Sequence, residues 1–481
     1  MQPLVLISTY VLFIALVLHP QIQAHNVFLH GINFPFHFDL SKPERIKSLS
    51  GTRVRNFRVV TADGISISGW HLLPDVVLHS KGTQLKHDGG AFDRSLRQYP
   101  TIICEYEGRL NFAVNLCYHL KSSLSPSPLP DFHGNAMNRG APFRIQAYKQ
   151  FTALGLNVVA VDYRGFGDSQ GSPSEEGLQR DARATHRWIR ERYEGQQSKD
   201  QTGSQPLPPP VIYIAGQSLG TGVATRLALD LLRVGESGLQ ERAGLLSPSS
   251  PLLIFPSSLL HSTYPGHPPD ALFLLAPYTS IGKLLSTYKI GGLLPIFWPL
   301  GVWKTLSKLA DRHLYTRFES DKAIYQIVKG RGGLGSGDDD DDDGNNHLSA
   351  EERRQYGNLD HTLSIATLRE ELGLRATNRQ GRQAATHIII SHADNDGVIP
   401  HTHGRSLFDT IAKALEGSTR KEREYDWGTT LSLHHSQADS SSSTDQYILI
   451  RSGSGGHNSV RQHAVQLFAE NVGLTQKTKR E

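Results

Sequence analysis

Residues 211–232, VIYIAGQSLGTGVATRLALDLL, pass from an apolar segment directly into a glycine-flanked serine and then into a second apolar segment. The first five residues have no polar face, as expected for a central parallel strand covered on both sides. The residues after Leu219 predict a largely buried helix. Ser218 lies between them in the pattern Gly-x-Ser-x-Gly, in which a strained strand-to-helix turn presents a serine hydroxyl. The stretch therefore predicts a nucleophilic Ser218, with a purely structural turn as the alternative.

The composition indicates a large globular chain. Its 481 residues allow two domains, or one α/β domain with insertions. Hydrophobic residues make up 38% of the chain and charged residues 20%, as in ordinary globular proteins. The formal net charge of +4 is small for this length, and no basic stripe with interleaved aromatic residues is present, so no nucleic-acid partner is expected. Only Cys104 and Cys117 are present, which excludes a disulfide scaffold.

The amino-terminal segment is apolar, and residues 4–18 carry no charge. This run is long for the core of a signal peptide and short for a membrane span, which needs about 17 to 25 residues. A retained anchor within residues 1–24 is favoured, and a cleaved signal peptide is the alternative. Residues 25–54 begin with aromatic residues and histidines, which are typical of a membrane-proximal segment. The expected location is the endoplasmic reticulum or another secretory-pathway membrane, or the outside of the cell if the segment is cleaved.

Strand and helix patterns alternate through residues 55–475. This alternation predicts a mostly parallel, doubly wound sheet with ligand chemistry at the carboxyl ends of its strands. Residues 55–74 predict a hairpin. Further strands are expected in TIIC from Thr101, NVVAVDY, ALFLLAP, THIIISHAD and YILIRSG, and further helices at residues 141–155, 174–193, 402–415 and 459–472.

Stretches rich in Pro, Ser, Gly or Asp interrupt this alternation. One of them contains six consecutive aspartates, which most simply remain solvated. We expect inserts, largely disordered, at about residues 105–131, 196–210, 234–268, 330–382 and 418–445. A small apolar cap is expected at about residues 280–328.

A serine nucleophile needs a histidine base, and the histidine needs a carboxylate that fixes its tautomer. The acid should follow a later strand, and HIIISHADNDGVIP supplies Asp396, with Asp394 as the alternative. His457 is the predicted base, because it lies in a glycine-rich loop between the last strand and the last helix. His401 and His403 begin a helix, and no third ligand at suitable spacing supports a metal site there. No metal and no other cofactor is therefore expected.

The transition state of acyl transfer also needs two backbone N–H donors for its oxyanion. We assign these donors to Leu219, directly after the nucleophile, and to Asn135 in the loop FHGNAMNRG. That loop should follow the strand TIIC directly, yet residues 105–131 separate the two. A recent insertion, or an intron retained in the coding sequence, would explain the interruption. A structured insert at this point would threaten the oxyanion geometry.

Five motifs together resemble the serine hydrolases of the α/β-hydrolase superfamily: FHGNAMNRG, VDYRGFGDSQGSPSEEGL, GQSLGTGVA, PDALFLLAPYTSI and HADNDGVIP. The likeness is greatest to the membrane-anchored monoacylglycerol and lysophosphatidylserine lipases of the α/β-hydrolase domain-containing protein twelve type. It covers about residues 55–473 apart from the inserts. The resemblance implies the α/β-hydrolase fold, a lipid ester substrate, and a triad of Ser218 as nucleophile, Asp396 as acid and His457 as base.

Residues 288–303, YKIGGLLPIFWPLGVW, concentrate large apolar side chains where such folds place a cap. They suit contact with an acyl chain or a membrane surface, and ordinary packing of cap helices is an equal alternative. The leading expectation is a hydrolase of monoacylglycerols or lysophospholipids. The alternatives are a thioesterase that removes fatty acyl groups from protein cysteines, and an inactive, membrane-tethered binding protein. The oligomeric state is not predicted.

Overall fold

The computed structural model describes nine main ranges of the chain: residues 39–79, 89–107, 137–195, 210–245, 269–287, 312–332, 363–372, 387–434 and 446–474. Isolated residues before residue 39 and between 302 and 310 are also described. Most of the apolar run 4–18, most of the inserts and residues 288–301 of the cap lie outside the described residues, and so do the predictions made for them.

Among the described residues, ten strands form one sheet: β1 (Val54–Val60), β2 (Ser66–Leu72), β3 (Thr101–Glu107), β4 (Asn157–Asp162), β5 (Ile212–Ser218), β6 (Ala271–Leu275), β7 (His387–Ala393), β8 (Thr419–Tyr425), β9 (Gly428–His434) and β10 (Tyr447–Ser452). Their order is β1-β2-β4-β3-β5-β6-β7-β10-β9-β8. In this sheet order the neighbouring strands β4, β3, β5, β6, β7 and β10 are parallel. Antiparallel pairs extend the sheet at both edges, with β1 and β2 at one and β9 and β8 at the other. This confirms the predicted mostly parallel, doubly wound sheet of the α/β-hydrolase fold.

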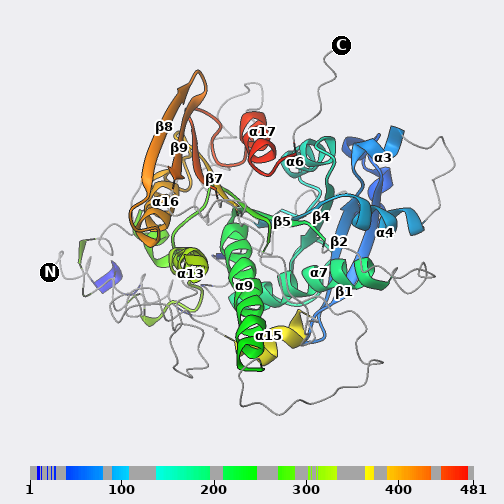
Figure 1. Cartoon of the computed structure of the whole chain (residues 1–481), viewed down its shortest axis with the longest axis horizontal. Coiled ribbons are helices and arrows are strands. Elements are labelled where there is room, and N and C mark those ends of the chain that lie inside the picture. The colour runs from blue at the N-terminus through cyan, green and yellow to red at the C-terminus, as the bar shows by residue number, and fades with distance from the viewer. Residues whose placement is uncertain are drawn as a thin grey trace.

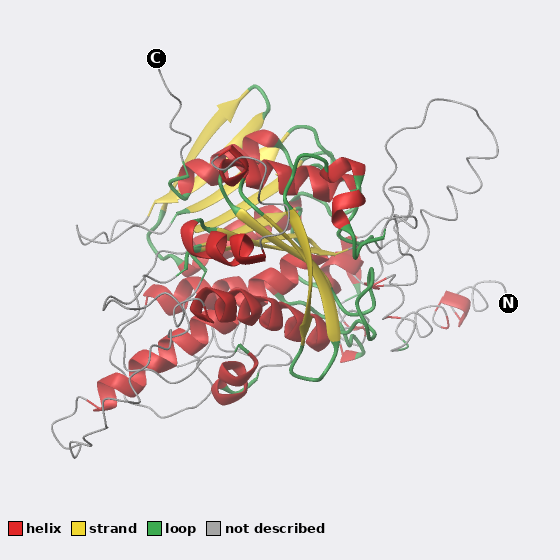
Figure 2. Cartoon of the chain, turned by 90° about the vertical axis from the view of Figure 1, so that its right-hand side faces the viewer, coloured by secondary structure: helices red, strands yellow, loops and turns green. Residues whose placement is uncertain are grey.

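Helices cover both faces of the sheet (Figures 1 and 2). Because successive side chains of a strand point to opposite faces, Ile388 and Ile390 of β7 pack in one core and Ile389 in the other. The first core is covered by α7 (Glu175–Gly195), α9 (Leu219–Leu245), α13 (Ser320–Gly332), α15 (Ile365–Glu371) and α16 (Thr402–Ala414). The second is covered by α6 (Pro142–Ala153), α17 (Gln462–Asn471) and η2 (Lys47–Leu49). Further elements among the described residues are α3 (Asp75–His79), α4 (Gly89–Gln98), α10 (Ile281–Thr287) and η1 (Pro43–Arg45).

Four stretches expected to be inserts contain regular structure in part, which corrects the prediction of disorder for those residues. Strand β3 continues to Glu107, within the expected insert 105–131. Helix α9 continues to Leu245, α15 lies within 330–382, and the hairpin of β8 and β9 occupies part of 418–445. The β8 strand was missed because it is the outermost strand of the sheet and every one of its side chains is exposed, so no apolar alternation marks it. Helix α15 is held by the burial of Leu368 and Leu372. Helix α17 begins at Gln462 with Arg461 as its N-cap, three residues later than predicted.

Residues that follow the amino-terminal apolar run contact the body of the fold. The side-chain amide of Gln23 donates to the carbonyl oxygen of His313 at 2.6 Å and accepts from the backbone N–H of Tyr315 at 3.1 Å. Val27 and Phe28 are buried in the first core. Within the part of the chain that the structure describes, no helix is both long and apolar enough to cross a membrane.

Strand β3 includes a buried acidic residue. Glu105 lies opposite Gly216 of β5 and is fully buried. The pKa of the Glu105 carboxyl is raised to about 7, mainly by burial. A hydrogen bond with Tyr163 lowers this pKa, and the nearby charge of Asp181 raises it. Residues 105–107 of the expected insert thus continue the strand and place a carboxyl group in the core.

The buried Glu105 predicts a specific pH dependence of stability. A folded-state pKa of about 7 exceeds the ordinary value of 4.5, so this group lowers the free energy of unfolding as the pH rises from about 4.5 to 7. The loss amounts to about 3 kcal/mol. Glu105→Gln is expected to remove it, measured by urea unfolding at pH 5 and pH 8. The exposed Glu416 serves as control: if Glu416→Gln flattens the pH dependence as much as Glu105→Gln, the assignment is wrong.

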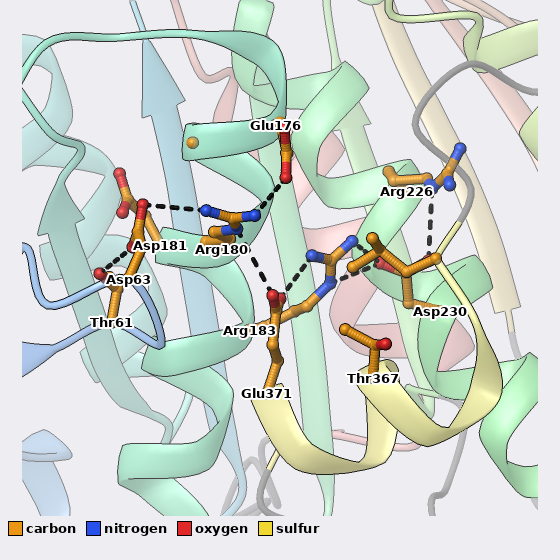
Figure 3. Close-up of polar contacts among 12 residues, drawn as sticks. Thr61, Asp63, Glu176, Arg180, Asp181, Arg183, Arg226, Asp230, Thr367 and Glu371 are labelled. Atoms are coloured by element: carbon orange, nitrogen blue, oxygen red, sulfur yellow. Dashed lines mark hydrogen bonds and ion pairs between the residues drawn. The ribbon is translucent and has the colours of Figure 1, made fainter.

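A buried network of ion pairs joins α7, α9 and α15 (Figure 3). Asp230 on α9 accepts hydrogen bonds from Arg183 at 2.9 and 2.7 Å and from Arg226 at 3.2 Å. Arg183 also donates to Glu371 of α15 at 2.7 Å. A second α7 arginine, Arg180, contacts Glu371, Glu176 and Asp63. These pairs bind α15 to the helices on one face of the sheet.

Removing the central carboxylate of this network is expected to destabilise the fold. Asp230→Asn removes the buried negative charge that Arg183 and Arg226 share, which costs about 3 kcal/mol of unfolding free energy. The matched control is Asp409→Asn, since Asp409 makes exposed ion pairs with Arg405 and Arg420. The control should change stability by less than about 1 kcal/mol. Equal effects of the two substitutions in urea unfolding would refute a stabilising role for the network.

Candidate active site

Ser218 lies at the end of β5, immediately before α9, with a φ of 54°. A residue with a side chain seldom adopts this left-handed conformation, which costs of the order of 1–3 kcal/mol and is typical of functional sites. Gly216 permits the tight turn: a Cβ atom there would lie 2.6 Å from the carbonyl oxygen of Gly220 and 2.8 Å from the Cβ of Ala224. The strained strand-to-helix turn expected from Gly-x-Ser-x-Gly is therefore present.

Asp396 and His457 form a hydrogen-bonded pair. His457 Nδ1 lies 2.7 Å from Asp396 Oδ2, and both side chains are buried. The other carboxylate oxygen, Oδ1, accepts from the backbone N–H groups of Val398 at 2.8 Å and Ile399 at 3.0 Å. Since an ionised carboxylate can only accept, the Nδ1 atom carries the proton, and Nε2 is the nitrogen available to act as a base.

The electrostatics keep Asp396 ionised. Burial alone would raise the pKa of this carboxyl, but the charge of His457 and the hydrogen bonds from His392 and His457 lower it well below its ordinary value. Attraction by facing histidines favours the charged form of a carboxyl group. Asp396 can therefore stabilise a positive charge on His457 throughout the neutral pH range.

The loop after β10 brings His457 to the residue that precedes Ser218. The side-chain amide of Gln217 donates to the carbonyl oxygen of His457 at 3.3 Å. Gly456 has a φ of 61°, and its N–H donates to the side chain of Asn395 at 2.8 Å, close to Asp396 in sequence. The structure thus gathers Ser218, Asp396 and His457 at the carboxyl edge of the parallel strands.

The alternative residues are placed differently. Asp394 is partly exposed and pairs with Arg451 at 2.9 Å, so the geometry favours Asp396 as the partner of His457. His403 is buried, with its ring nitrogens 3.0 Å from the Thr279 hydroxyl and 2.9 Å from the Thr287 hydroxyl. Burial above all, and the charges of His392 and Lys283, lower the pKa of His403 to about 4.

Of the two predicted oxyanion donors, the structure describes Leu219 but not Asn135. Leu219 is the first residue of α9, so its N–H lies at a helix N-terminus, where backbone donors and the helix dipole favour an anion. Asn135 lies outside the described residues. His392, whose Nε2 is 3.4 Å from Asp396 Oδ2, was not predicted from the sequence. Two features of the sequence could have pointed to His392: it lies four residues before Asp396, and it lies near the end of the strand that precedes Asp396.

Comparison with curated proteins supports the predicted resemblance. The chain is 29% identical over 309 residues to lysophosphatidylserine lipase ABHD12 of Danio rerio, covering 64% of this chain and 60% of that protein. It is 34% identical over 209 residues to ABHD12 of Xenopus tropicalis, covering 43% and 42%. Human protein ABHD12B is 30% identical over 202 residues, covering 42% and 43%. The chain therefore spans less than two thirds of the length of each of these relatives.

Two solved structures give low TM-scores against the chain. The esterase Pf2001 of Pyrococcus furiosus gives a TM-score of 0.36 at 10% identity, covering 88% of this chain and 89% of that one. An α/β hydrolase of Vibrio vulnificus gives a TM-score of 0.37 at 12% identity, covering 87% and 81%. No protein-family model matches the chain. The sequence comparisons identify the chain as a relative of the lysophosphatidylserine lipases named ABHD12 and of protein ABHD12B.

Proposed function

We propose that this chain is a serine hydrolase that cleaves the fatty acyl ester of a lysophospholipid or a monoacylglycerol. The hydrogen bond between His457 Nδ1 and Asp396 Oδ2, at the sheet edge that also holds Ser218, is the observation that carries the proposal. The names of the relatives support a lipid ester as the substrate class.

In the proposed reaction, Ser218 attacks the ester carbonyl while His457 Nε2 takes its proton. The negative charge on the tetrahedral intermediate is stabilised by the N–H of Leu219 and a second backbone donor, for which we propose Asn135. His457 then protonates the leaving glycerol oxygen, and the ester bond breaks to give an acyl-enzyme. Water, deprotonated by the same histidine, attacks this intermediate and releases the fatty acid.

We also propose that the reaction takes place at a membrane surface. Val302 and Trp303, at the end of the apolar segment 288–303, are 58% and 59% exposed. Tyr315, whose N–H binds the side chain of Gln23, is exposed as well. Exposed aromatic residues near apolar segments suit contact with lipid head groups and acyl chains. Co-sedimentation of the full chain with phosphatidylcholine vesicles tests this part of the proposal.

A substrate panel tests the proposed function. The full chain is assayed with lysophosphatidylserine, a monoacylglycerol and a palmitoylated cysteine peptide, and the released fatty acid is measured. We expect at least one of the two oxygen esters to be hydrolysed, with kcat/KM about tenfold or more above that of the thioester. Turnover of the peptide alone would assign a thioesterase instead, and turnover of none of the three by folded protein would contradict the proposal.

A further inference from the structure

His392 lies beside the Asp396–His457 pair and has no part in the reaction described above. It is the penultimate residue of β7, and its side chain is fully buried. Its Nε2 atom lies 2.9 Å from the carbonyl oxygen of Ile399 and 3.4 Å from Asp396 Oδ2. Because a carbonyl oxygen has no hydrogen to donate, Nε2 must carry the proton.

The Ile399 carbonyl belongs to the turn that holds Asp396. The N–H of Ile399 and that of Val398 donate to Asp396 Oδ1, while the carbonyl of Ile399 accepts from His392. His392 is thus linked to both sides of the carboxylate, through the turn on the Oδ1 side and by close approach on the Oδ2 side. These contacts fix the carboxylate plane that faces His457.

Packing also fixes the ring of His392. Gly404, in the first turn of α16, lies against it: a Cβ atom at this position would be 2.7 Å from His392 Nδ1 and 3.3 Å from its Cγ. The neighbouring His403 is held by Thr279 and Thr287. The close approach of α16 therefore depends on a glycine at 404 and allows the imidazole little freedom to turn.

We propose that His392 is a positioning residue that orients the Asp396 carboxylate toward His457, through its own Nε2–H and through the Ile399 carbonyl. The effect of His392 on catalysis rests on the proposed function. His392 contacts the acid of the triad rather than the lipid, so it acts on kcat and on the proton affinity of His457, and leaves KM unchanged.

Two substitutions of His392 test the kinetic part. His392→Leu removes the donor, whereas His392→Gln retains an N–H group near the position of Nε2. The leucine variant is expected to lower kcat for lysophosphatidylserine about 10- to 100-fold, the effect of losing a hydrogen bond in a charged network. The acidic limb of its pH–rate profile should move to lower pH, because a poorly oriented carboxylate favours the protonated His457 less. The glutamine variant should retain most of the activity.

A spectroscopic measurement tests the geometry independently of activity. In the Ser218→Ala chain, the proton between His457 Nδ1 and Asp396 should give a low-field ¹H NMR signal. Adding His392→Leu should abolish that signal, and adding His392→Gln should preserve it. If the wild-type chain hydrolyses no ester, the proposed function fails, but this comparison still decides the role of His392.

Gly404→Ala provides a second route if the leucine variant does not fold. The added methyl group displaces the ring without removing it, so the His457 signal and kcat should both fall. Persistence of the signal in the folded leucine or alanine variant would overturn the proposal. Equal losses of kcat in the leucine and glutamine variants, without a shift of the pH profile, would also overturn it.

Discussion

Ser218→Ala is expected to lower kcat for a lysophospholipid ester by about 10⁶-fold, because in the proposed reaction the Ser218 hydroxyl forms the acyl-enzyme. The loss should appear in kcat rather than in substrate binding, since the hydroxyl makes its decisive contribution in the transition state. Folding should be unaffected, because alanine replaces a small side chain at a turn defined by the backbone. Fatty acid release and circular dichroism measure the two quantities.

The exposed Ser406 on α16 provides a matched control. Ser406→Ala should leave kcat unchanged. Hydrolysis by the Ser218→Ala chain at more than about one thousandth of the wild-type rate would mean that another residue is the nucleophile.

Asp396→Asn is expected to lower kcat by about 10⁴-fold. The amide can donate a hydrogen bond to His457 Nδ1, which favours the tautomer with its proton on Nε2 and so removes the base. The substitution also deletes the negative charge that stabilises protonated His457 during the reaction. Steady-state kinetics across pH 5 to 9 would measure the loss.

Asp394 serves as the control for this prediction, because it lies two residues away and pairs with Arg451 instead. Asp394→Asn should change kcat less than about tenfold. If Asp394→Asn caused the larger loss, the assignment of the acid would be reversed.

The central part of the fold could be predicted from the sequence because the parallel strands are buried on both faces. Strand β5 begins with continuous apolar residues before Ser218, and α9 has closely spaced buried apolar residues from Val223 onward. The same holds for β7, which ends just before Asp396. The positions of Ser218, Asp396 and His457 at one edge then follow from the rule that ligand chemistry lies at the carboxyl ends of parallel strands.

The elements that were not predicted from the sequence lack the continuous apolar pattern of the buried parallel strands. The side chains of β8 are all exposed, and its pairing with β9 depends on backbone hydrogen bonds, which leave no pattern in a sequence. Helix α15 is stabilised by a contact between Glu371 and Arg183, residues that are far apart along the chain. His392 was passed over for a similar reason, because its contact with Ile399 depends on a turn that periodicity does not predict.

Labelling with a fluorophosphonate probe, followed by mass spectrometric identification of the modified residue, tests directly whether Ser218 is an activated nucleophile. The probe reacts with an activated serine whatever the head group or chain length of the natural substrate. We expect a single modified residue, Ser218, and no labelling of the Ser218→Ala chain. Modification of a different residue, or no modification of folded wild-type protein, would mean that Ser218 is not the activated nucleophile.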